Sequence, residues 1–319
     1  MVPPMPPLVS IVSPSYNQAA YLEATLRSVL EQDYPRIEYR VIDGASTDGS
    51  VEIIRRYAGR LAGWVSEPDK GQAEAINKGF AQARGEIVAW LNSDDLYLPG
   101  AVSAAVRAFE RHPEAGLVYG DVVSIDSGGQ AINVMTFADW GLDELLQFNI
   151  ISQPGVFIRR SILERTGFLD PGFHYLLDHH LWLRAARLAP LRYVRERWAA
   201  ARFHPDAKNL NQAPGFGREA DRLVDWLAQQ PDFQPEWRRL ERRIRAGADR
   251  MNGRYLLDGG LAREALARYL RGLARSPGMI LPEWRRILFA AASLLVNVDA
   301  LRRAYLERRA RALSARDRR

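Results

Sequence analysis

The first hundred residues alternate short apolar segments with amphipathic ones, and this alternation constrains the fold more than any other feature of the 319-residue chain. Leu8–Ser13 and Ile37–Ile42 have the composition of short buried strands, whereas Tyr21–Leu30 places apolar side chains at helical spacing. The same unit continues with a helix from residue 51, a short strand at 64–66, a helix over 71–83 and a strand over 86–92. Such alternation implies a mostly parallel sheet with helices on both faces.

The pattern changes along the second half of the chain. A mixed region begins at about Leu117, and the segment 168–188 is predicted to contain a helix that carries Asp178. Beyond about Gly215 the strand patterns disappear and the remaining third is predicted to be helical. We therefore expect an α/β domain over residues 1–214 and a helical region over 215–319 that serves packing, oligomerisation or contact with a membrane surface.

Composition excludes several classes of protein. The chain has no cysteine, which rules out disulfides, zinc-thiolate sites, iron–sulfur clusters and a cysteine nucleophile. It also lacks a signal-peptide pattern and any apolar stretch of about 18 residues, so we expect a cytoplasmic protein. The apolar run over 287–298 is flanked by arginines; a buried packing helix is the first interpretation, and shallow insertion at the inner face of the membrane is the second.

The net charge of +6 comes from arginines that are concentrated in the C-terminal part, since lysine occurs only at positions 70, 78 and 208. This distribution fits an anionic membrane surface or a composition bias. The tail lacks the aromatic platforms or recognition motif that nucleic-acid binding requires. We therefore expect no nucleic-acid partner.

Three polar motifs follow predicted strands: SPSYN after the first, DGAS after the second and NSDD after the fourth. In sheets of this kind, ligands collect at the carboxyl ends of the strands. Asp94 and Asp95 could hold Mg²⁺ or Mn²⁺ while the oxygens of a bound diphosphate complete the coordination shell. An acidic turn or a helix cap is the alternative for an isolated Asp-Asp pair, but its position among the other motifs favours a metal site.

The segments 9–50 and 67–102 closely resemble the N-terminal half of family 2 glycosyltransferases, and the order and spacing of motifs agree from about Leu8 to about His204. The resemblance implies a GT-A fold, which is a Rossmann-like, mostly parallel sheet flanked by helices, here with a helical C-terminal extension. It also implies inverting transfer of a sugar from a nucleotide-diphosphate sugar to an acceptor hydroxyl, in cell-surface polysaccharide or glycoconjugate synthesis. A divalent metal, Mn²⁺ or Mg²⁺, is the implied cofactor.

The resemblance places Pro14, Tyr16, Asn17 and Asp43 around the nucleotide. A tyrosine can stack on a base, and a carboxylate can accept a hydrogen bond from a base or a ribose. Many family members have a second acidic residue at the position of Gly44, so this sequence leaves the base open. A UDP-sugar is the first choice as donor, with GDP- and dTDP-sugars as alternatives.

The same resemblance assigns donor contacts to Asp69, Lys70 and Gln72, where a lysine suits phosphate as a point charge. It aligns the family's Asp-x-Asp metal motif with the consecutive residues Asn92, Ser93, Asp94 and Asp95. An amide cannot supply a carboxylate's charge, so Asp94 becomes the main metal ligand. Asn92 suits a ribose or base hydrogen bond, and Asp95 orients the site or contacts the sugar.

Sugar transfer with inversion needs a base that deprotonates the acceptor hydroxyl. The segment LLDHHLWLR resembles the family's base-bearing segment, which makes Asp178 the catalytic residue, with Leu177 in place of the usual glutamate. Adjacent helical residues point about 100° apart, so His179 and His180 are interpreted as acceptor-site lining or packing rather than a metal site. In the family's late loop, His204 could reach the metal or the diphosphate, and Lys208 is a weaker candidate.

Two other functions remain as alternatives. A nucleotidyltransferase would need a glycine-rich triphosphate loop after the first strand, which SPSYNQAAYLE lacks. A non-catalytic nucleotide-sugar-binding protein would keep the fold without the reaction, and the presence of both Asp94 and Asp178 argues against it. The acceptor stays open among a saccharide, a lipid-linked saccharide and a protein.

Overall fold

The computed structural model describes residues 5–204 and 213–294 and divides the chain into two compact units. The first unit contains Met1–Ile125, Val134–Gly141 and Ile151–Arg202. The second contains Asp126–Asn133, Leu142–Ile150 and Phe203–Arg319. The domain division after residue 214, which the sequence suggests, stays a prediction.

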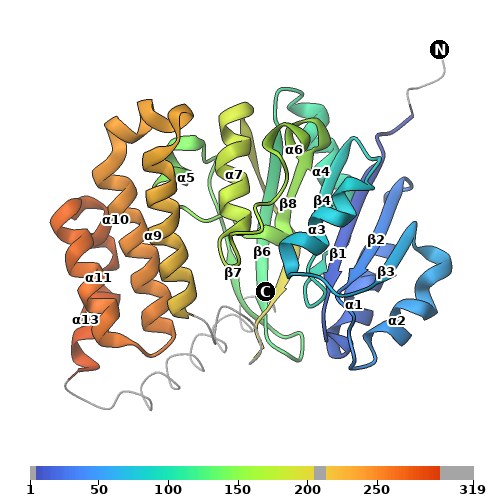
Figure 1. Ribbon diagram of the computed structural model, residues 1–319, viewed down its shortest axis with the longest axis horizontal. Coiled ribbons are helices and arrows are strands. Elements are labelled where there is room, and N and C mark those ends of the chain that lie inside the picture. Colours follow the sequence, from blue (N-terminus) through green and yellow to red (C-terminus); the bar gives the residue numbers. More distant parts are fainter. Residues whose placement is uncertain (1–4, 205–212, 295–319) are drawn as a thin grey trace, which may run out of the picture. The chain divides into compact units, whose positions relative to one another are not determined.

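A mixed sheet forms the centre of the first unit (Figure 1). Within the described residues its strands run in the order β3-β2-β1-β4-β8-β6-β9-β5, and β7 pairs with β6. The strands are β1 Val9–Ser15, β2 Ile37–Asp43, β3 Gly63–Ser66, β4 Ile87–Trp90, β5 Leu96–Tyr97, β6 Leu117–Ile125, β7 Ala131–Met135, β8 Val156–Arg159 and β9 Leu191–Arg202.

The first four strands of this sheet are parallel, as the alternation of strands and helices predicts. β6 and β9 are also parallel. In contrast, β8 is antiparallel to both of its neighbours, β4 and β6, and β5 is antiparallel to β9. The parallel part therefore brings the carboxyl ends of β1, β2 and β4 to one edge.

Helices cover both faces of the parallel strands. They are α1 Ala19–Leu30, α2 Ser50–Tyr57, α3 Gln72–Ala81, α4 Ala101–Arg111, α6 Arg160–Thr166 and α7 Leu177–Leu188. On one face, Ile11 and Ala89 belong to a core with apolar side chains of α1, α2 and α4. On the other face, Gly79 of α3 lies so close to Val12 that a side chain at position 79 would overlap it. Alternate strand residues thus bury opposite faces, which explains why these strands read as continuous apolar runs.

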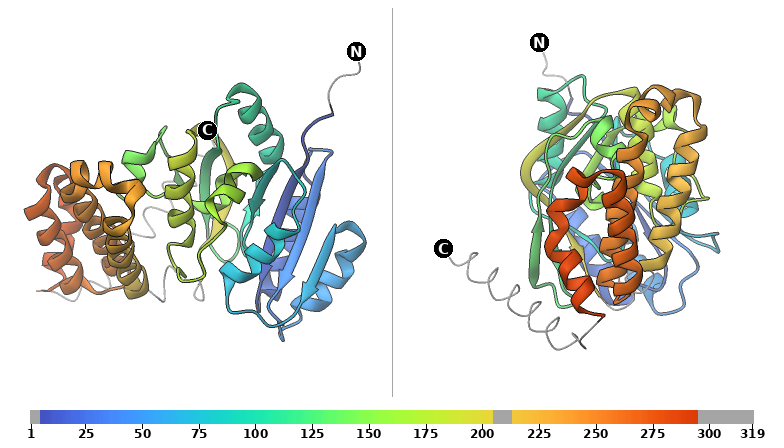
Figure 2. Two further views of the ribbon diagram at one scale, coloured as in Figure 1. Left: turned by 45° about the horizontal axis from the view of Figure 1, so that its top comes forward. Right: turned by 90° about the vertical axis from the view of Figure 1, so that its left-hand side faces the viewer.

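The second unit is helical, as predicted for the last third of the chain. Its helices are α5 Leu142–Leu146, α9 Ala213–Gln229, α10 Gln234–Asp258, α11 Ala262–Arg275, α12 Pro277–Ile280 and α13 Trp284–Ala292. The helices α9, α10 and α11 lie side by side in every view (Figures 1 and 2). Gly253 of α10 and Gly272 of α11 let neighbouring helices approach closely, because an added side-chain carbon would lie 2.9 Å from Tyr269 and Ile280 respectively.

The sequence pattern predicts no membrane-spanning segment. Among residues 5–204 and 213–294, no helix combines the length and the apolar character needed to span a bilayer.

Candidate active site

The loops that follow β1 and β2 are joined by side-chain hydrogen bonds. The amide of Asn17 donates to Ser46 Oγ at 2.8 Å, and Asn17 Oδ1 accepts from the Thr47 amide at 2.9 Å. Asp48 accepts from the amides of Ala19, at 2.8 Å, and of Ser50, at 3.0 Å. Asn17, predicted to contact the nucleotide, therefore holds the two loops together.

Backbone strain occurs in the same two loops. Asn17 and Ala45 have φ values of 51° and 63°, in the left-handed region that non-glycine residues rarely adopt. Such conformations persist only where the surrounding contacts hold them, and they are typical of ligand-binding sites. The hydrogen bonds across the two loops supply that restraint.

Asp43 ends β2 and is fully buried. Its carboxylate accepts hydrogen bonds from the Ser46 amide, at 2.9 Å, from Ser46 Oγ, at 2.5 Å, and from Ser66 Oγ, at 2.7 Å. The sequence suggested that this carboxylate contacts the base or the ribose. In the structure it organises the loop after β2 and ties that loop to the end of β3.

Tyr16, Gly44 and Asp69 lie together at the carboxyl ends of β1 and β2. A side-chain carbon at position 44 would stand 2.8 Å from Asp69 Oδ2 and 3.3 Å from Tyr16 Cδ2. Tyr16 is 64% exposed, one of few large apolar side chains in the described residues that is so open. Pro14 precedes it inside β1 and is buried. The glycine that departs from the family pattern therefore makes room for a carboxylate from another segment.

The segment between β3 and α3 carries three of the predicted donor contacts. Asp69 Oδ1 accepts from the amide of Gly71, which has φ 118° and precedes the first residue of α3. Lys70 is exposed, and its amide donates to Glu74 at 2.9 Å. Gln72 begins α3 and donates through Nε2 to Asn92 Oδ1 at 2.7 Å. This hydrogen bond connects the segment to the end of β4.

The motif after β4 forms a small network around one buried carboxylate. Asp95 Oδ1 accepts from the Arg202 amide at 2.9 Å, and Asp95 Oδ2 accepts from Asn92 Nδ2 at 3.3 Å. Asp95 is 6% exposed and Ser93 is also buried, whereas the side chain of Asp94 is half-buried. Asp94 is thus the more accessible carboxylate of the pair.

Burial, and after it the negative charge of Asp94, raises the pKa of Asp95 well above its usual value. The hydrogen bonds from Arg202 and Asn92 act in the opposite direction but do not outweigh these two effects. The folded protein therefore disfavours the ionised form of the Asp95 carboxylate.

The side chains after β4 fit a divalent cation. Both carboxylates and the Asn92 amide offer oxygen donors, the type that Mg²⁺ and Mn²⁺ prefer, and a cation would offset the burial and the negative charge of Asp94 that raise the pKa of Asp95. The part of the chain that the structure describes contains no group of three or more His, Cys, Asp or Glu side chains arranged to hold a metal ion. A cation here would need oxygens from a bound ligand as well.

Asp178 lies in the first turn of α7, and its Oδ1 accepts from the amide of His179 at 2.7 Å. One turn further along α7, Trp182 stacks on Trp90 of β4 with ring centroids 5.3 Å apart. Asn77 of α3 also exchanges two hydrogen bonds with the backbone of Leu169, in the segment that leads into α7. The helix that carries Asp178 is therefore anchored to the same strand that carries the acidic motif.

Three histidine predictions have different outcomes in the structure. His179 and His180 are both buried, and the ring of His180 packs on Phe173 with centroids 4.3 Å apart. His204 is buried in the second unit, so its proposed role beside the metal stays a prediction. Lys208 lies outside the described residues.

Arg202 is the organising residue that the sequence did not indicate. Besides its amide bond to Asp95, its Nε donates to the Asp94 carbonyl oxygen at 3.0 Å, and its guanidinium lies over the ring of Tyr21. Thr25 Oγ1 donates to the Asp95 carbonyl oxygen at 2.8 Å. The contact of Arg202 with the NSDD motif could not be predicted, because the two segments are far apart in the sequence and nothing local in ARFHPD indicates it.

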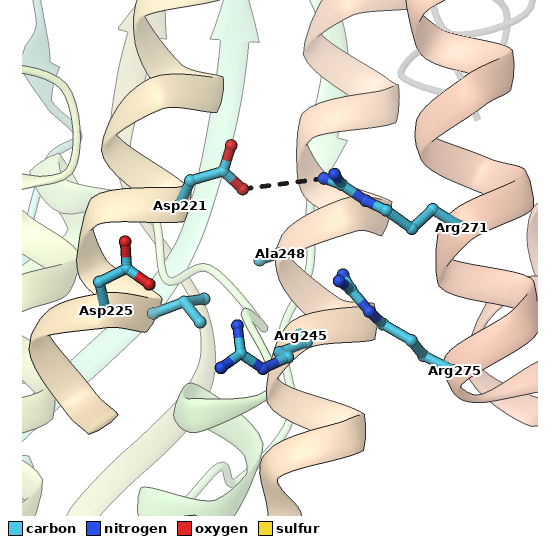
Figure 3. Close-up of a pocket in the computed structure, with 7 residues that line it drawn as sticks. Asp221, Asp225, Arg245, Ala248, Arg271 and Arg275 are labelled. Atoms are coloured by element: carbon cyan, nitrogen blue, oxygen red, sulfur yellow. Dashed lines mark ion pairs between the residues drawn. The ribbon is translucent and has the colours of Figure 1, made fainter.

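A separate cavity of about 200 Å³ lies in the second unit (Figure 3). Its lining comes from α9, α10 and α11 and consists of Asp221, Val224, Asp225, Arg245, Ala248, Arg271 and Arg275. Arg271 pairs with Asp221 and with the buried Asp249, and Arg275 also pairs with Asp249. None of the predicted site residues lines this cavity.

Comparison with known proteins identifies the N-terminal part of the chain. The model of the family described as Glycosyl transferase family 2 matches residues 10–164. The O-antigen biosynthesis protein RfbC of Myxococcus xanthus is 31% identical over 208 residues, which make up 61% of this chain and 16% of that protein. The chain spans 16% to 35% of the length of the first three curated relatives that it matches.

Solved structures share the fold. S. aureus TarS, residues 1–349, superposes with a TM-score of 0.61 at 16% identity, covering 86% of this chain and 82% of TarS; TarS has also been solved with UDP-GlcNAc. The mannosyltransferase PcManGT of Pyrobaculum calidifontis, in complex with GDP-Man and Mn²⁺, gives 0.58 at 23% identity, covering 91% and 88%. The expected GT-A-type α/β fold with a helical C-terminal region is confirmed.

Proposed function

Because the chain belongs to glycosyl transferase family 2 through residues 10–164, we propose that it is an inverting, metal-dependent glycosyltransferase that uses a nucleotide-diphosphate sugar. The observation that carries this proposal is the convergence of three loops at the carboxyl ends of β1, β2 and β4. Tyr16 and the Asn92–Asp95 motif lie in these loops, and Asp69, from the segment after β3, lies against Gly44. A parallel sheet binds its ligands at this edge.

The donor base is assigned to the exposed ring of Tyr16 and the carboxylate of Asp69, which meet over Gly44. An aromatic ring can stack on the base while the carboxylate accepts a hydrogen bond from a base or ribose donor. TarS has been solved with UDP-GlcNAc and PcManGT with GDP-Man, so both nucleotides belong in a donor screen. A UDP-sugar is our first choice, with GDP- and dTDP-sugars next.

Asp94 is assigned as the main protein ligand of Mn²⁺ or Mg²⁺. Asp95 and Asn92, which are hydrogen-bonded to each other, are assigned as supporting residues of this site. When bound, the cation would neutralise the charge that develops on the departing diphosphate. We assign the exposed Lys70 to the phosphates of the donor, where its ammonium group would add positive charge. Gln72 keeps the Asn92 amide oriented through its 2.7 Å hydrogen bond.

Asp178 is assigned as the general base that removes the acceptor's hydroxyl proton as that oxygen attacks the anomeric carbon. Its carboxylate is oriented by the amide of His179, and α7 is fastened to β4 by the stacked Trp182 and Trp90 rings. The bond that forms joins the acceptor oxygen to the sugar, and the bond that breaks releases the nucleoside diphosphate. The likeness to an O-antigen biosynthesis protein supports a saccharide or lipid-linked acceptor in surface-polysaccharide synthesis.

The reaction is tested with a panel of UDP-, GDP- and dTDP-sugars, with and without Mn²⁺, scored by donor hydrolysis and by thermal stabilisation. Asp178→Asn is expected to lower turnover by on the order of 10³ while nucleotide binding is retained. Asp94→Asn is expected to lose the stabilisation that depends on Mn²⁺. Asp139→Asn, which alters an exposed carboxylate paired with Arg192, is the control. Full turnover in Asp178→Asn would reject the base assignment.

The donor pocket is tested with a pair of glycine substitutions. Gly44→Ala places a carbon against Asp69 and Tyr16 and is expected to raise the KM for the donor about tenfold or more, with little change in the unfolding temperature. Gly59→Ala is the matched control, because a side-chain carbon there meets nothing within 4 Å. An unchanged donor KM in Gly44→Ala would move the base pocket elsewhere.

A further inference from the structure

The described residues expose few large apolar side chains, and most of these are in one short part of the second unit. Of the seven that are most exposed, five fall between residues 270 and 294. Tyr16, in the donor loops, is accounted for by the proposed nucleotide site. The exposed apolar side chains of the second unit have no such account.

Three of them recur at helical spacing. Leu281 lies in the turn Leu281–Glu283 that leads into α13, and Trp284 and Leu288 follow on the same face after three and four residues. They are 57%, 53% and 59% exposed. The opposite side of α13 packs inward, since Ala290 is fully buried in a core with Ile280 and Tyr269. We call Leu281, Trp284 and Leu288 the outer stripe of α13.

Positive charge accompanies this stripe. Arg285 is exposed, and its guanidinium lies 5.2 Å from the centre of the Trp284 ring. The sequence that follows directly, residues 295–319, carries eight arginines and three acidic residues. Over residues 203–319 there are 24 basic and 14 acidic residues, whereas residues 1–202 carry 20 and 24. The basic character of the chain thus belongs to the part that exposes the apolar stripe.

An amphipathic helix with tryptophan and leucine on one face and arginine beside them is the pattern that lies in the plane of a membrane interface. The tryptophan ring suits the boundary between headgroups and acyl chains, and arginines are attracted to anionic headgroups. A stable protein dimer needs about 800 Å² from each partner, which three side chains cannot supply. A membrane requires only such a small apolar contact when charge adds to it.

We propose that the outer stripe of α13 is a docking surface for an anionic lipid bilayer, with the side chains of Leu281, Trp284 and Leu288 entering the headgroup boundary. Arg285, whose guanidinium lies beside the Trp284 ring, supplies attraction to phosphate headgroups. This docking does not depend on the proposed sugar transfer. It would hold the enzyme at the surface where a lipid-linked acceptor is found.

The first experiment is co-sedimentation of the full-length protein with vesicles of phosphatidylglycerol and phosphatidylcholine. We expect binding that increases with the phosphatidylglycerol fraction and that is mostly released at about 0.5 M salt. Trp284→Ser/Leu288→Ser should lower the bound fraction about tenfold or more. Leu270→Ser, which removes an equally exposed leucine from α11, is the matched control and should bind like the wild type.

A second experiment reports insertion directly. The chain has no cysteine, so Leu288→Cys provides a single thiol for an environment-sensitive fluorophore. The label should brighten with anionic vesicles and be quenched by brominated lipids, whereas a label on Ala267→Cys, exposed on α11, should not respond.

Three results would overturn the proposal. The first is equal binding by the wild type and the double variant, and the second is equal loss in Leu270→Ser. The third is evidence that the stripe is an interface between two copies. In that case light scattering would show a wild-type dimer that Trp284→Ser/Leu288→Ser dissociates, and the wild type would not bind vesicles.

Discussion

Two buried aspartates, Asp95 in the sheet unit and Asp249 in the helical unit, have opposite electrostatic surroundings. Asp249 is 1% exposed and pairs with Arg268, Arg271 and Arg275 of α11. Asp95 is 6% exposed, and its carboxylate accepts one hydrogen bond from a backbone amide and one from an amide side chain, while Asp94 is the adjacent residue.

The difference separates a carboxylate that joins two helices from one that we assign to the proposed metal site. Around Asp249 the positive charge exceeds the negative, so that site needs no further cation and serves to hold α10 and α11 together. Around Asp95, burial and after it the negative charge of Asp94 disfavour the ionised carboxylate, and the raised pKa reports this cost. Perturbed carboxylates of this kind are concentrated at functional sites, which supports the metal site that we propose.

The largest effect is expected from Asp249→Asn, because it leaves three arginines facing a neutral group. Removal of one partner from a buried ion pair costs about 3–5 kcal/mol, so the free energy of unfolding should fall by about that amount. Chemical denaturation at neutral pH measures it. Asp143→Asn removes an exposed carboxylate that pairs with Arg239 in the same unit and should cost about 1 kcal/mol or less. Similar losses in the two variants would contradict the structural role of Asp249.

Glu38 extends the comparison into the sheet unit. Burial alone would raise its pKa, but hydrogen bonds from Ser10, Arg84 and Arg40 lower it to about 2. A carboxylate whose pKa is depressed on folding stabilises the fold above its unfolded pKa of about 4.5 and loses that contribution as pH falls toward 2. The contribution at neutral pH is about 3 kcal/mol.

Glu38→Gln should therefore remove most of the loss of stability between pH 4.5 and pH 2, measured by urea denaturation across that range. Glu31→Gln, which alters an exposed pair with Arg27, is the control and should leave the acid profile close to that of the wild type. A wild-type profile in Glu38→Gln would show that the stabilisation belongs to other groups.

The smallest effect has the opposite sign. Asp95→Asn should raise the free energy of unfolding of the metal-free protein at neutral pH by about 1 kcal/mol, the usual size of a gain when a functional charge is removed. A raised pKa means that the folded state is destabilised when Asp95 ionises, so the advantage of the variant should shrink as pH falls and the wild type takes up its proton.

Denaturation with a chelator present, at several pH values, measures this difference. Added Mn²⁺ and nucleoside diphosphate should stabilise the wild type more than Asp95→Asn. A variant that is less stable than the wild type at every pH would show that Asp95 is structural, like Asp249.

Local patterning was sufficient to predict the parallel part of the sheet and the helical last third. The strands that precede the NSDD, DGAS and SPSYN motifs were predicted because short apolar runs between turn residues are typical of buried strands. The antiparallel insertion of β8 could not be predicted, since the Val156–Arg159 segment carries no mark of its neighbours β4 and β6.

The site shows the same limit. Asp94 and Asp95 were chosen from their position after a strand, and the assignment of Asp43 to the nucleotide stays a prediction. No local pattern indicates that Ser46 and Ser66 donate hydrogen bonds to the Asp43 carboxylate. Arg202 was missed because its contact with Asp95 joins residues 107 positions apart.

By itself the sequence determined which residue types stand at the ends of the strands, since hydrophobic periodicity and turn chemistry are local properties. The tertiary structure decided which of these carboxylates are neutralised and which retain unbalanced charge. Burial and charge neighbours depend on contacts between distant segments, such as β9 against the loop after β4 and α11 against α10. These contacts place Asp95 and Asp249, the same side chain, in two different electrostatic surroundings.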